Sequence, residues 1–332
     1  MVNANYSTSL LAGTFERYMR NKPTDNIFGD VRLFPWLNKK TKMRLDGGER
    51  ILEPLLYRES TALGSYRGAD VLDLTVQETN TNAEFEYQQY YMTVVIDGRT
   101  KLLNAGKSRQ VNILATKIRQ AKNSLANTMN THCFADGTGN NSKNLTGLAA
   151  MVLNSGTYGG ISRTTDTWWK SVVDTDASAM AIAGLHGWRR MYNDCSLGQG
   201  NQTPDAIITT QILYEAYEAT MDTNMRFTRM DEGPAHKGYT LRYKDAEVWW
   251  DDACTAGVTY FLNSDVMNLV VHEARGEGDM DKEDGFAAGH FRLGEFESPL
   301  NQDVESAKAF WMGNLTANNC RLLGKRSGQT NS

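Results

Sequence analysis

Residues 49–97 constrain the fold more than any other part of the chain, because they hold two strand-like runs with too little apolar surface for a core of their own. The outgoing run is Glu49–Arg58, and the returning run is Glu84–Ile96, followed by Asp97 and Gly98. Isolated two-stranded hairpins are marginally stable in water. We therefore expect this hairpin to extend from the body and to lie on another surface, most simply that of a neighbouring subunit.

The returning run alternates in polarity with the two-residue period of a half-buried strand. One face carries Phe85, Tyr87, Tyr91, Thr93 and Val95, and the other carries Glu84, Glu86 and Gln88. Both faces are apolar over 94–96, which predicts that this end is buried in the body. The tip, residues 61–82, contains glycines and many small polar residues and is expected to be mobile.

Arginine supplies the positive charge of this region, since no lysine lies between Lys42 and Lys101. Arginine forms bidentate pairs with carboxylates and suits interfaces better than lysine does. The side chains that we predict to contact neighbouring subunits are Arg50, Tyr57, Arg58, Glu59, Arg67, Glu84, Glu86 and Tyr87.

The rest of the chain has an uncommon order of elements. Residues 1–48 are expected to form an extended N-terminal arm with a short helix over 9–19 and a basic run over 39–44. Apolar residues then repeat at spacings of three and four, which predicts one long amphipathic helix over 105–134, about 45 Å in length. The positions that carry this repeat are Val111, Leu114, Ile118, Ala121, Leu125 and Met129.

A compact α/β region is expected over residues 161–275, with helices near 178–192 and 210–221 and strands at 206–210, 240–243 and 247–250. The turn Asn263–Asp265 predicts that the runs 258–262 and 267–271 pair as a hairpin. An acidic glycine-rich loop over 275–284, a final strand over 306–315 and a basic tail over 321–326 complete the chain.

The composition narrows the classes of function. The chain has 332 residues and a formal net charge of −4, which argues against a dedicated nucleic-acid binder. No apolar run approaches the ~20 residues that a membrane-spanning helix needs. The first residues show no basic region followed by an apolar stretch, so no secretion signal is predicted. The four cysteines are widely spaced, which predicts free thiols in a reducing compartment.

The motifs that could carry chemistry fail on their spacing. Ala105–Ser108 resembles the end of a phosphate-binding loop, but Lys101 stands where that motif needs glycine. Asp279–Glu283 resembles a calcium loop, but Asp284 occupies the glycine position and His290 that of the bidentate glutamate. No histidine pair has metal-ligand spacing, and no nucleophile elbow is present. We expect no catalytic residue, cofactor or metal.

The order of arm, hairpin, long helix, α/β region and return strand resembles the major capsid proteins of tailed bacteriophages, with the α+β Hong Kong 97-type fold. The stretches that carry this resemblance are Asp136–Ala149, Leu241–Asp252, Thr259–Asn263, Leu269–His272, Gln302–Val304 and Phe310–Thr316. Each is weak alone, and their order carries the likeness over most of the chain.

The resemblance implies a division of the chain into an N-terminal arm, an extended loop that lies across a neighbouring subunit, a peripheral domain with its spine helix, an axial domain that meets its copies at the centres of hexamers and pentamers, and a return to the peripheral domain. The respective ranges are 1–48, 49–97, 98–160, 161–275 and 276–332. It also implies a virion capsid, assembled in the host bacterial cytoplasm around double-stranded DNA that is held nonspecifically, and no membrane.

Two departures from the family qualify this reading. Some members link subunits covalently through a lysine of the extended loop, and this loop has none, so noncovalent stabilisation is expected. Some members begin with a long helical scaffolding segment, and there is no room for one before the arm. We therefore expect a separate scaffolding protein or direct assembly, unless the sequence is that of an already processed chain, together with a portal and a cementing protein.

Three other functions remain open at this point. The first is the shell of a cellular encapsulating compartment around an enzyme cargo, and the second is a tail or decoration protein of a virion. The third is an enzyme, such as a hydrolase that uses scattered carboxylates, which would need two titratable groups within reach of each other in a polar cleft.

Overall fold

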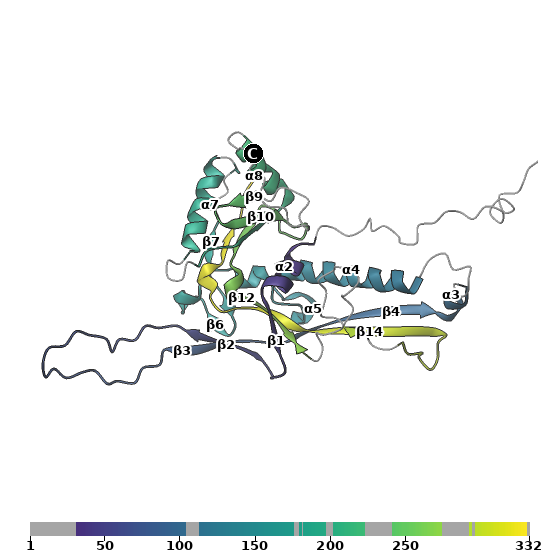
Figure 1. The fold of residues 1–332 in the computed structure, drawn as a ribbon, viewed down its shortest axis with the longest axis horizontal. Coiled ribbons are helices and arrows are strands. Elements are labelled where there is room, and N and C mark those ends of the chain that lie inside the picture. The colour runs from purple at the N-terminus through teal and green to yellow at the C-terminus, as the bar shows by residue number, and fades with distance from the viewer. Residues whose placement is uncertain are drawn as a thin grey trace, which may run out of the picture.

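The computed structural model describes residues 31–103, 113–175, 179–180, 182–196, 202–222, 241–273, 292–293 and 296–330. Figure 1 shows a long lower layer that contains α4, β4 and β14, and an upper α/β part that contains α7 and α8. A narrow hairpin extends from the lower layer beyond β2 and β3.

Strand β14 (Val304–Ala317) is the centre of the lower sheet. It pairs antiparallel with β4 (Gln88–Asp97), from Val304 opposite Asp97 to Gly313 opposite Gln88. Its C-terminal part pairs with β12 (Met267–His272), which pairs in parallel with β1 (Lys42–Leu45). The short β13 (Arg292–Leu293) also pairs with β14. This sheet therefore joins segments that lie far apart in the sequence.

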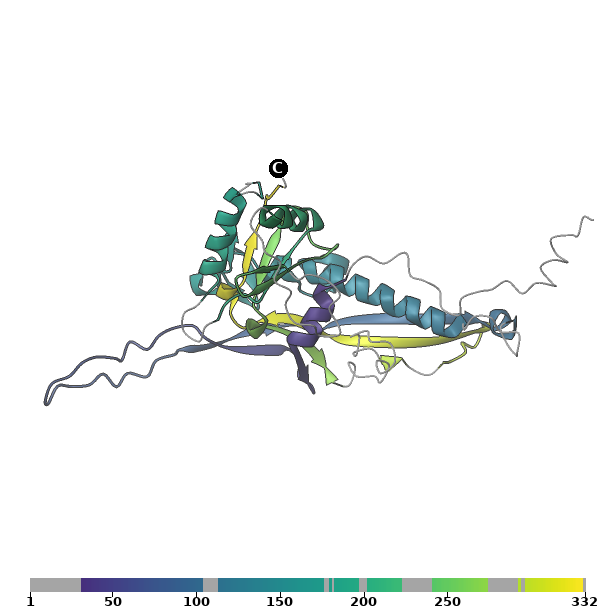
Figure 2. The same cartoon turned by 45° about the horizontal axis from the view of Figure 1, so that its top comes forward.

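Helix α4 (Ile113–Phe134) runs along β4 and β14, as Figure 2 shows. Its residues Leu125 and Met129 pack with Met92 and Trp311 in the main hydrophobic core. The long helix that the apolar repeat predicts is confirmed from Ile113 onward, while residues 104–112 lie outside the described part of the chain.

The upper sheet has the strand order β7-β15-β11-β8-β10-β9. Helices α7 (Ile182–Asp194) and α8 (Gln211–Asp222) pack on one face of it, where the rings of Trp188 and Tyr217 stack with centroids 4.9 Å apart. The opposite face contributes Ile208, Tyr260 and Leu262 to the main core. The strands are β7 (Val172–Asp174), β8 (Ala206–Thr209), β9 (Leu241–Tyr243), β10 (Ala246–Trp250), β11 (Thr259–Leu262) and β15 (Gly324–Arg326).

The remaining elements are short. They are α2 (Leu33–Lys40), β2 (Ile51–Leu56), β3 (Asn80–Phe85), α3 (Gly98–Leu103), α5 (Gly139–Ser142), α6 (Leu148–Met151), β5 (Thr157–Tyr158), β6 (Ile161–Ser162) and three 3-10 turns, η1 (Thr167–Trp169), η2 (Ser264–Val266) and η3 (Cys320–Leu322).

A buried carboxylate joins the two layers. Asp251, which follows β10, accepts hydrogen bonds from the backbone N–H groups of Arg32 (2.9 Å) and Leu33 (3.0 Å) at the start of α2. It also accepts from Nδ2 of Asn130 on α4, at 2.8 Å, and Oδ1 of Asn130 accepts from the Phe34 N–H. One side chain next to the upper sheet thus holds both α2 and α4, because free N–H groups at a helix start need an acceptor.

Four sequence-based expectations differ from the structure. The expected strand over 84–96 is two strands, β3 and β4, which belong to different sheets. The chain switches sheets at Glu86 and Tyr87, and this inverts the inward face: β4 buries residues 92, 94 and 96 and exposes 91, 93 and 95. The hairpin expected from runs 258–262 and 267–271 is also wrong, since β11 pairs with β8 and β15.

The other two differences concern the ends of the chain. Residues 33–45, expected in an extended arm, form α2 and β1, and α2 buries Leu33, Phe34 and Leu37 in the main core. The basic tail contains β15, and its Arg326 is fully buried against α7. The helix expected over 9–19 and the acidic loop over 275–284 lie outside the described residues.

All four cysteines are free and buried, which confirms the prediction of free thiols. Burial raises the pKa of Cys195 and of Cys254 to about 12, so few of these groups are thiolates near neutral pH. A buried thiol of this kind acts as a small apolar side chain.

We expect Asp251→Ala to lower the free energy of unfolding by about 3 kcal/mol, because it leaves buried donors of α2 and Asn130 without an acceptor. The measurement is denaturant unfolding of the unassembled subunit followed by tryptophan fluorescence. Asp265→Ala removes an exposed carboxylate of the same layer and should change stability by less than about 0.5 kcal/mol. Equal effects of the two substitutions would show that the junction contributes little.

Candidate interaction surface

The extended hairpin has a paired root. Strands β2 and β3 are antiparallel from Ile51 opposite Phe85 to Leu56 opposite Asn80, and the Tyr57 N–H donates to the Thr79 carbonyl beyond them. Alternate residues of β2, namely Ile51, Glu53 and Leu55, point into the core, whereas Leu52 and Leu56 are exposed. The root is therefore part of the folded body and needs no other subunit to form.

Contacts on both sides fasten this root. Glu53 is buried, and its Oε1 accepts hydrogen bonds from Thr316 Oγ1 at 2.8 Å and from Asn268 Nδ2 at 3.2 Å. On the other side the Glu84 N–H donates to the Gly159 carbonyl, and the ring of Phe85 packs edge-on against Tyr158 with centroids 4.9 Å apart. These contacts fix the direction in which the hairpin leaves the body.

The tip beyond the root is more apolar than expected. Six of the fifteen exposed large apolar side chains of the described residues lie on the tip, between Leu63 and Val76. Val71 is 98% exposed and Val76 is 96% exposed, and Leu74 between them is also exposed. Exposed apolar side chains gathered in one segment mark a surface that another molecule covers.

The predicted contact residues divide between the root and the tip. Arg50 and Glu84 pair with each other across β2 and β3 at 2.9 Å, so part of their binding capacity is used within the subunit. The Tyr57 hydroxyl donates to the Glu78 carbonyl, and that of Tyr87 donates to the Gly47 carbonyl. Glu86 is exposed at the switch between β3 and β4.

The other three predicted residues, Arg58, Glu59 and Arg67, are exposed on the tip. Their role in contacts between subunits stays a prediction. The sequence-based prediction did not include the apolar segment 71–76, because it rested on the charged and small polar residues of the tip. In this segment Leu72, Leu74 and Val76 alternate with Asp73 and Thr75, and this alternation indicates an extended segment with one apolar face.

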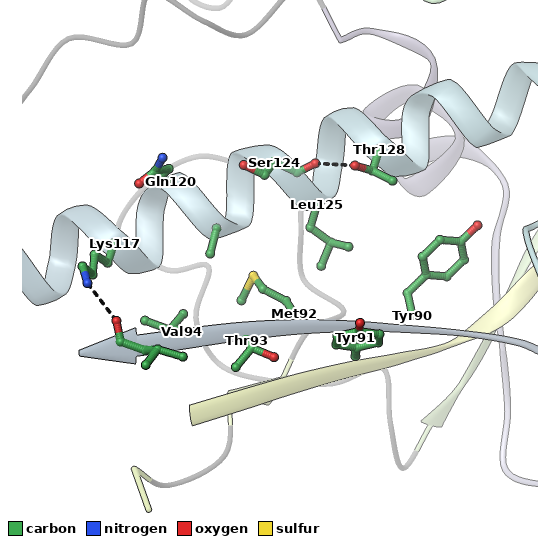
Figure 3. Close-up of a pocket in the computed structure, with 12 residues that line it drawn as sticks. Tyr90, Tyr91, Met92, Thr93, Val94, Lys117, Gln120, Ser124, Leu125 and Thr128 are labelled. Atoms are coloured by element: carbon green, nitrogen blue, oxygen red, sulfur yellow. Dashed lines mark hydrogen bonds between the residues drawn. The ribbon is translucent and has the colours of Figure 1, made fainter. Parts of the chain in front are cut away.

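A groove of about 490 Å³ separates α4 from β4 at the other end of the lower layer (Figure 3). Leu125 and Met92 point toward each other across it, and Lys117 closes one end by donating from Nζ to the Val95 carbonyl at 2.8 Å. Gln120, Ser124 and Thr128 line the helix side. The groove has a polar rim, while Leu125 and Met92 at its floor are largely buried.

The described residues offer no arrangement that favours catalysis. No three histidine, cysteine or acidic side chains of the described ranges gather where they could hold a metal ion. His132 lies with Nδ1 2.8 Å from the Tyr90 hydroxyl, which accepts from the Leu145 N–H, so this histidine ties α4 to β4. His236, His290 and the two motifs at 105–108 and 279–283 lie outside the described residues.

Burial shifts the pKa values of Tyr90 and His132, and in each case it favours the neutral form. Desolvation raises the pKa of Tyr90 to about 12 and lowers the pKa of His132 below its ordinary value. Both groups are therefore neutral at neutral pH.

In the helices that the structure describes, no segment is long and apolar enough to cross a membrane.

We expect Gly159→Ala to destabilise the root of the hairpin. Gly159 has φ +59°, and a Cβ there would lie 2.8 Å from Phe85 Cζ and 2.9 Å from Ala83 Cβ. The positive φ costs about 1–2 kcal/mol, and crowding of the Phe85 ring adds about 1–3 kcal/mol. The measurements are the free energy of unfolding and the hydrogen-exchange rate of the Glu84 amide.

Gly160→Ala is the matched control, because Gly160 also has a positive φ but a Cβ there meets nothing within 4 Å. It should show the backbone cost alone. Equal losses for the two variants would mean that contact with Phe85 does not hold the root.

Comparison with known proteins gives a consistent result at the level of the fold. No protein-family model matches the sequence, and no curated protein matches it. Solved structures do: the cyanophage A-1(L) capsid is 18% identical, with a TM-score of 0.67 over 98% of each chain. The SrpI encapsulin of Synechococcus elongatus is 8% identical, with a TM-score of 0.61 over 98% of this chain and 96% of that one. The Mycobacterium phage Adephagia structure is 10% identical, with a TM-score of 0.58 over 98% of this chain and 99% of that one.

These likenesses extend over nearly the whole chain and include both of its layers and the hairpin. The expected α+β class is confirmed, and the chain has the Hong Kong 97-type fold of bacteriophage capsid proteins.

Proposed function

We propose that this chain is a structural shell protein that assembles, as hexamers and pentamers of itself, into an icosahedral capsid around a double-stranded DNA phage genome. The observation that carries the proposal is the hairpin, with a root fastened to the body and a tip that exposes apolar side chains to no partner within the described subunit. The fold shared with phage capsids supports the same conclusion. A shell role needs no catalytic site.

We place the tip of one copy on the groove between α4 and β4 of the next. Figure 1 shows the hairpin at one end of the lower layer and α3, with the adjoining ends of α4 and β4, at the other end. A copy therefore cannot fill its own groove. Leu72, Leu74 and Val76 suit the apolar floor, and Arg58, Glu59 and Arg67 suit the polar rim. Covering each large apolar side chain contributes about 1.5–3 kcal/mol, less the cost of ordering the tip.

The proposed partners follow from this role. They are further copies of the chain, a separate scaffolding protein, a portal, a cementing protein, and packaged DNA held without sequence preference. The location is the virion, after assembly in the cytoplasm of a bacterial host. The net charge of −4 fits a shell that encloses DNA without binding it tightly.

A cellular encapsulating compartment is the second candidate, favoured by the similarity to the SrpI encapsulin. The content of purified particles separates the two functions. Nuclease-protected DNA inside particles made during infection supports a capsid, whereas a single enriched protein cargo supports a compartment.

Replacement of residues 58–78 by Asn-Gly is expected to leave a folded subunit that assembles at least tenfold less. Tyr57 and Thr79 are already hydrogen-bonded, so a two-residue turn can connect them without strain. The measurements are sedimentation velocity and negative-stain electron microscopy of particles. Ser124→Trp, which fills the groove from the helix side, should lower assembly in a similar way. Normal particles from both variants would contradict the proposal.

Particles are expected to dissociate completely to a 37.1 kDa chain when they are boiled in denaturant. The reason is that residues 43–100 contain no lysine, so the hairpin has no amine for a covalent link to another subunit. The measurement is a denaturing gel of purified particles under reducing conditions. A ladder of covalent multimers that mass spectrometry assigns to isopeptide bonds would overturn this prediction.

A further inference from the structure

The two helices of the upper layer expose faces of opposite charge. The outer face of α7 carries Arg189 and Arg190, and the exposed His186 lies one helical turn before them. The outer face of α8 carries Glu215 and Glu218, and the helix contains no basic residue. Their buried faces share one core, so the charged faces point outward.

The helices lie on different flanks of the upper layer. In both views of the molecule α7 lies at the left of the upper layer and α8 lies to its right (Figures 1 and 2). Neither glutamate of α8 lies within ion-pair distance of a basic side chain in the part of the chain that the structure describes. Ile212 stands exposed beside them, at 59%.

The charge of α7 is only partly compensated within the subunit. Arg190 is 77% exposed and approaches Asp194 one turn later, at 3.6 Å. Arg189 hydrogen-bonds the Tyr243 side chain, which carries no charge near neutral pH because burial raises the pKa of this tyrosine. The face therefore keeps an excess of positive charge.

We propose that α7 of one copy docks on α8 of the next copy, and that this contact sets the head-to-tail direction of a ring of subunits. This inference rests on the proposed self-assembly. A ring related by rotation needs two different, complementary surfaces on each copy, whereas a two-fold contact centred on either helix would bring like faces together. Opposite charges on separate flanks fit the ring and oppose the two-fold contact.

The contact acts through specificity more than through affinity. Exposed ion pairs are individually weak and are screened by salt. Complementary charge nonetheless steers encounter and disfavours wrong orientations. Ile212 adds apolar area at the same place.

Charge reversal tests the pairing directly. Variant A carries R189E and R190E, variant B carries E215K and E218K, and variant C carries all four changes. At low salt, A and B alone should each assemble roughly five-fold less than the parent chain. Variant C restores complementarity with the faces exchanged, so it should assemble as the parent does.

A mixture of A and B in equal amounts gives a second readout. In an alternating ring of six every contact between A and B is complementary, so hexamers should return. A ring of five cannot alternate and keeps one repulsive contact, so pentamers should not. Native mass spectrometry of the rings distinguishes these species.

The readouts separate this inference from the proposed function. Failure of the parent chain to assemble contradicts the proposed function itself. Normal assembly of A and B at low salt, or failure of C to assemble, contradicts the inference alone, provided that circular dichroism shows each variant folded. A variant that does not fold is replaced by E218K alone, which changes one exposed side chain and should lower assembly in a salt-dependent way.

Discussion

The antiparallel pairing of β14 with β4 is the interaction on which the other parts of the structure depend. Ten residue pairs join two strands that lie more than two hundred positions apart in the sequence. The same strand β14 pairs with β12, which pairs with β1, and its buried face receives α4. Loss of this ladder would separate the hairpin, α4 and the N-terminal segment from one another.

This ladder also explains how a long hairpin can leave a small body in a defined direction. Chain entropy opposes any fixed arrangement of an isolated two-stranded arm. Here only two residues separate β3 from β4, and β4 pairs along its whole length with β14. The position of the root is therefore fixed by the lower sheet. Glu53 and Gly159 then fasten the root from opposite sides. The tip beyond Tyr57 has local hydrogen bonds, such as those between Thr61 and Gln77, but its apolar side chains stay exposed.

The sequence-based predictions were correct where a single local pattern determines the structure. The spacing of Ile118, Leu125 and Met129 predicts α4, because it reflects burial of one face of one helix. The pairing of β11 and β12 could not be predicted in this way. The Asn263–Asp265 turn is compatible with a hairpin, but β12 gains more by pairing with the long β14 than with its neighbour in sequence. Likewise no local sequence pattern gives Asp251 a role, and only its distant partners Leu33 and Asn130 make it a junction.

The predicted contact residues show the same limit at the level of the interaction surface. A count of charges favours Arg50 and Glu84, yet they pair with each other across one hairpin, and this reduces what they can offer a neighbour. The exposed apolar residues from Val71 to Val76 have no competing contact of that kind within the described subunit. Assembly through them would combine a apolar contact at the tip with charge complementarity between α7 and α8. In the proposed assembly the first would supply most of the affinity and the second the direction of the ring, because burial of apolar area is non-directional whereas charge discriminates between faces.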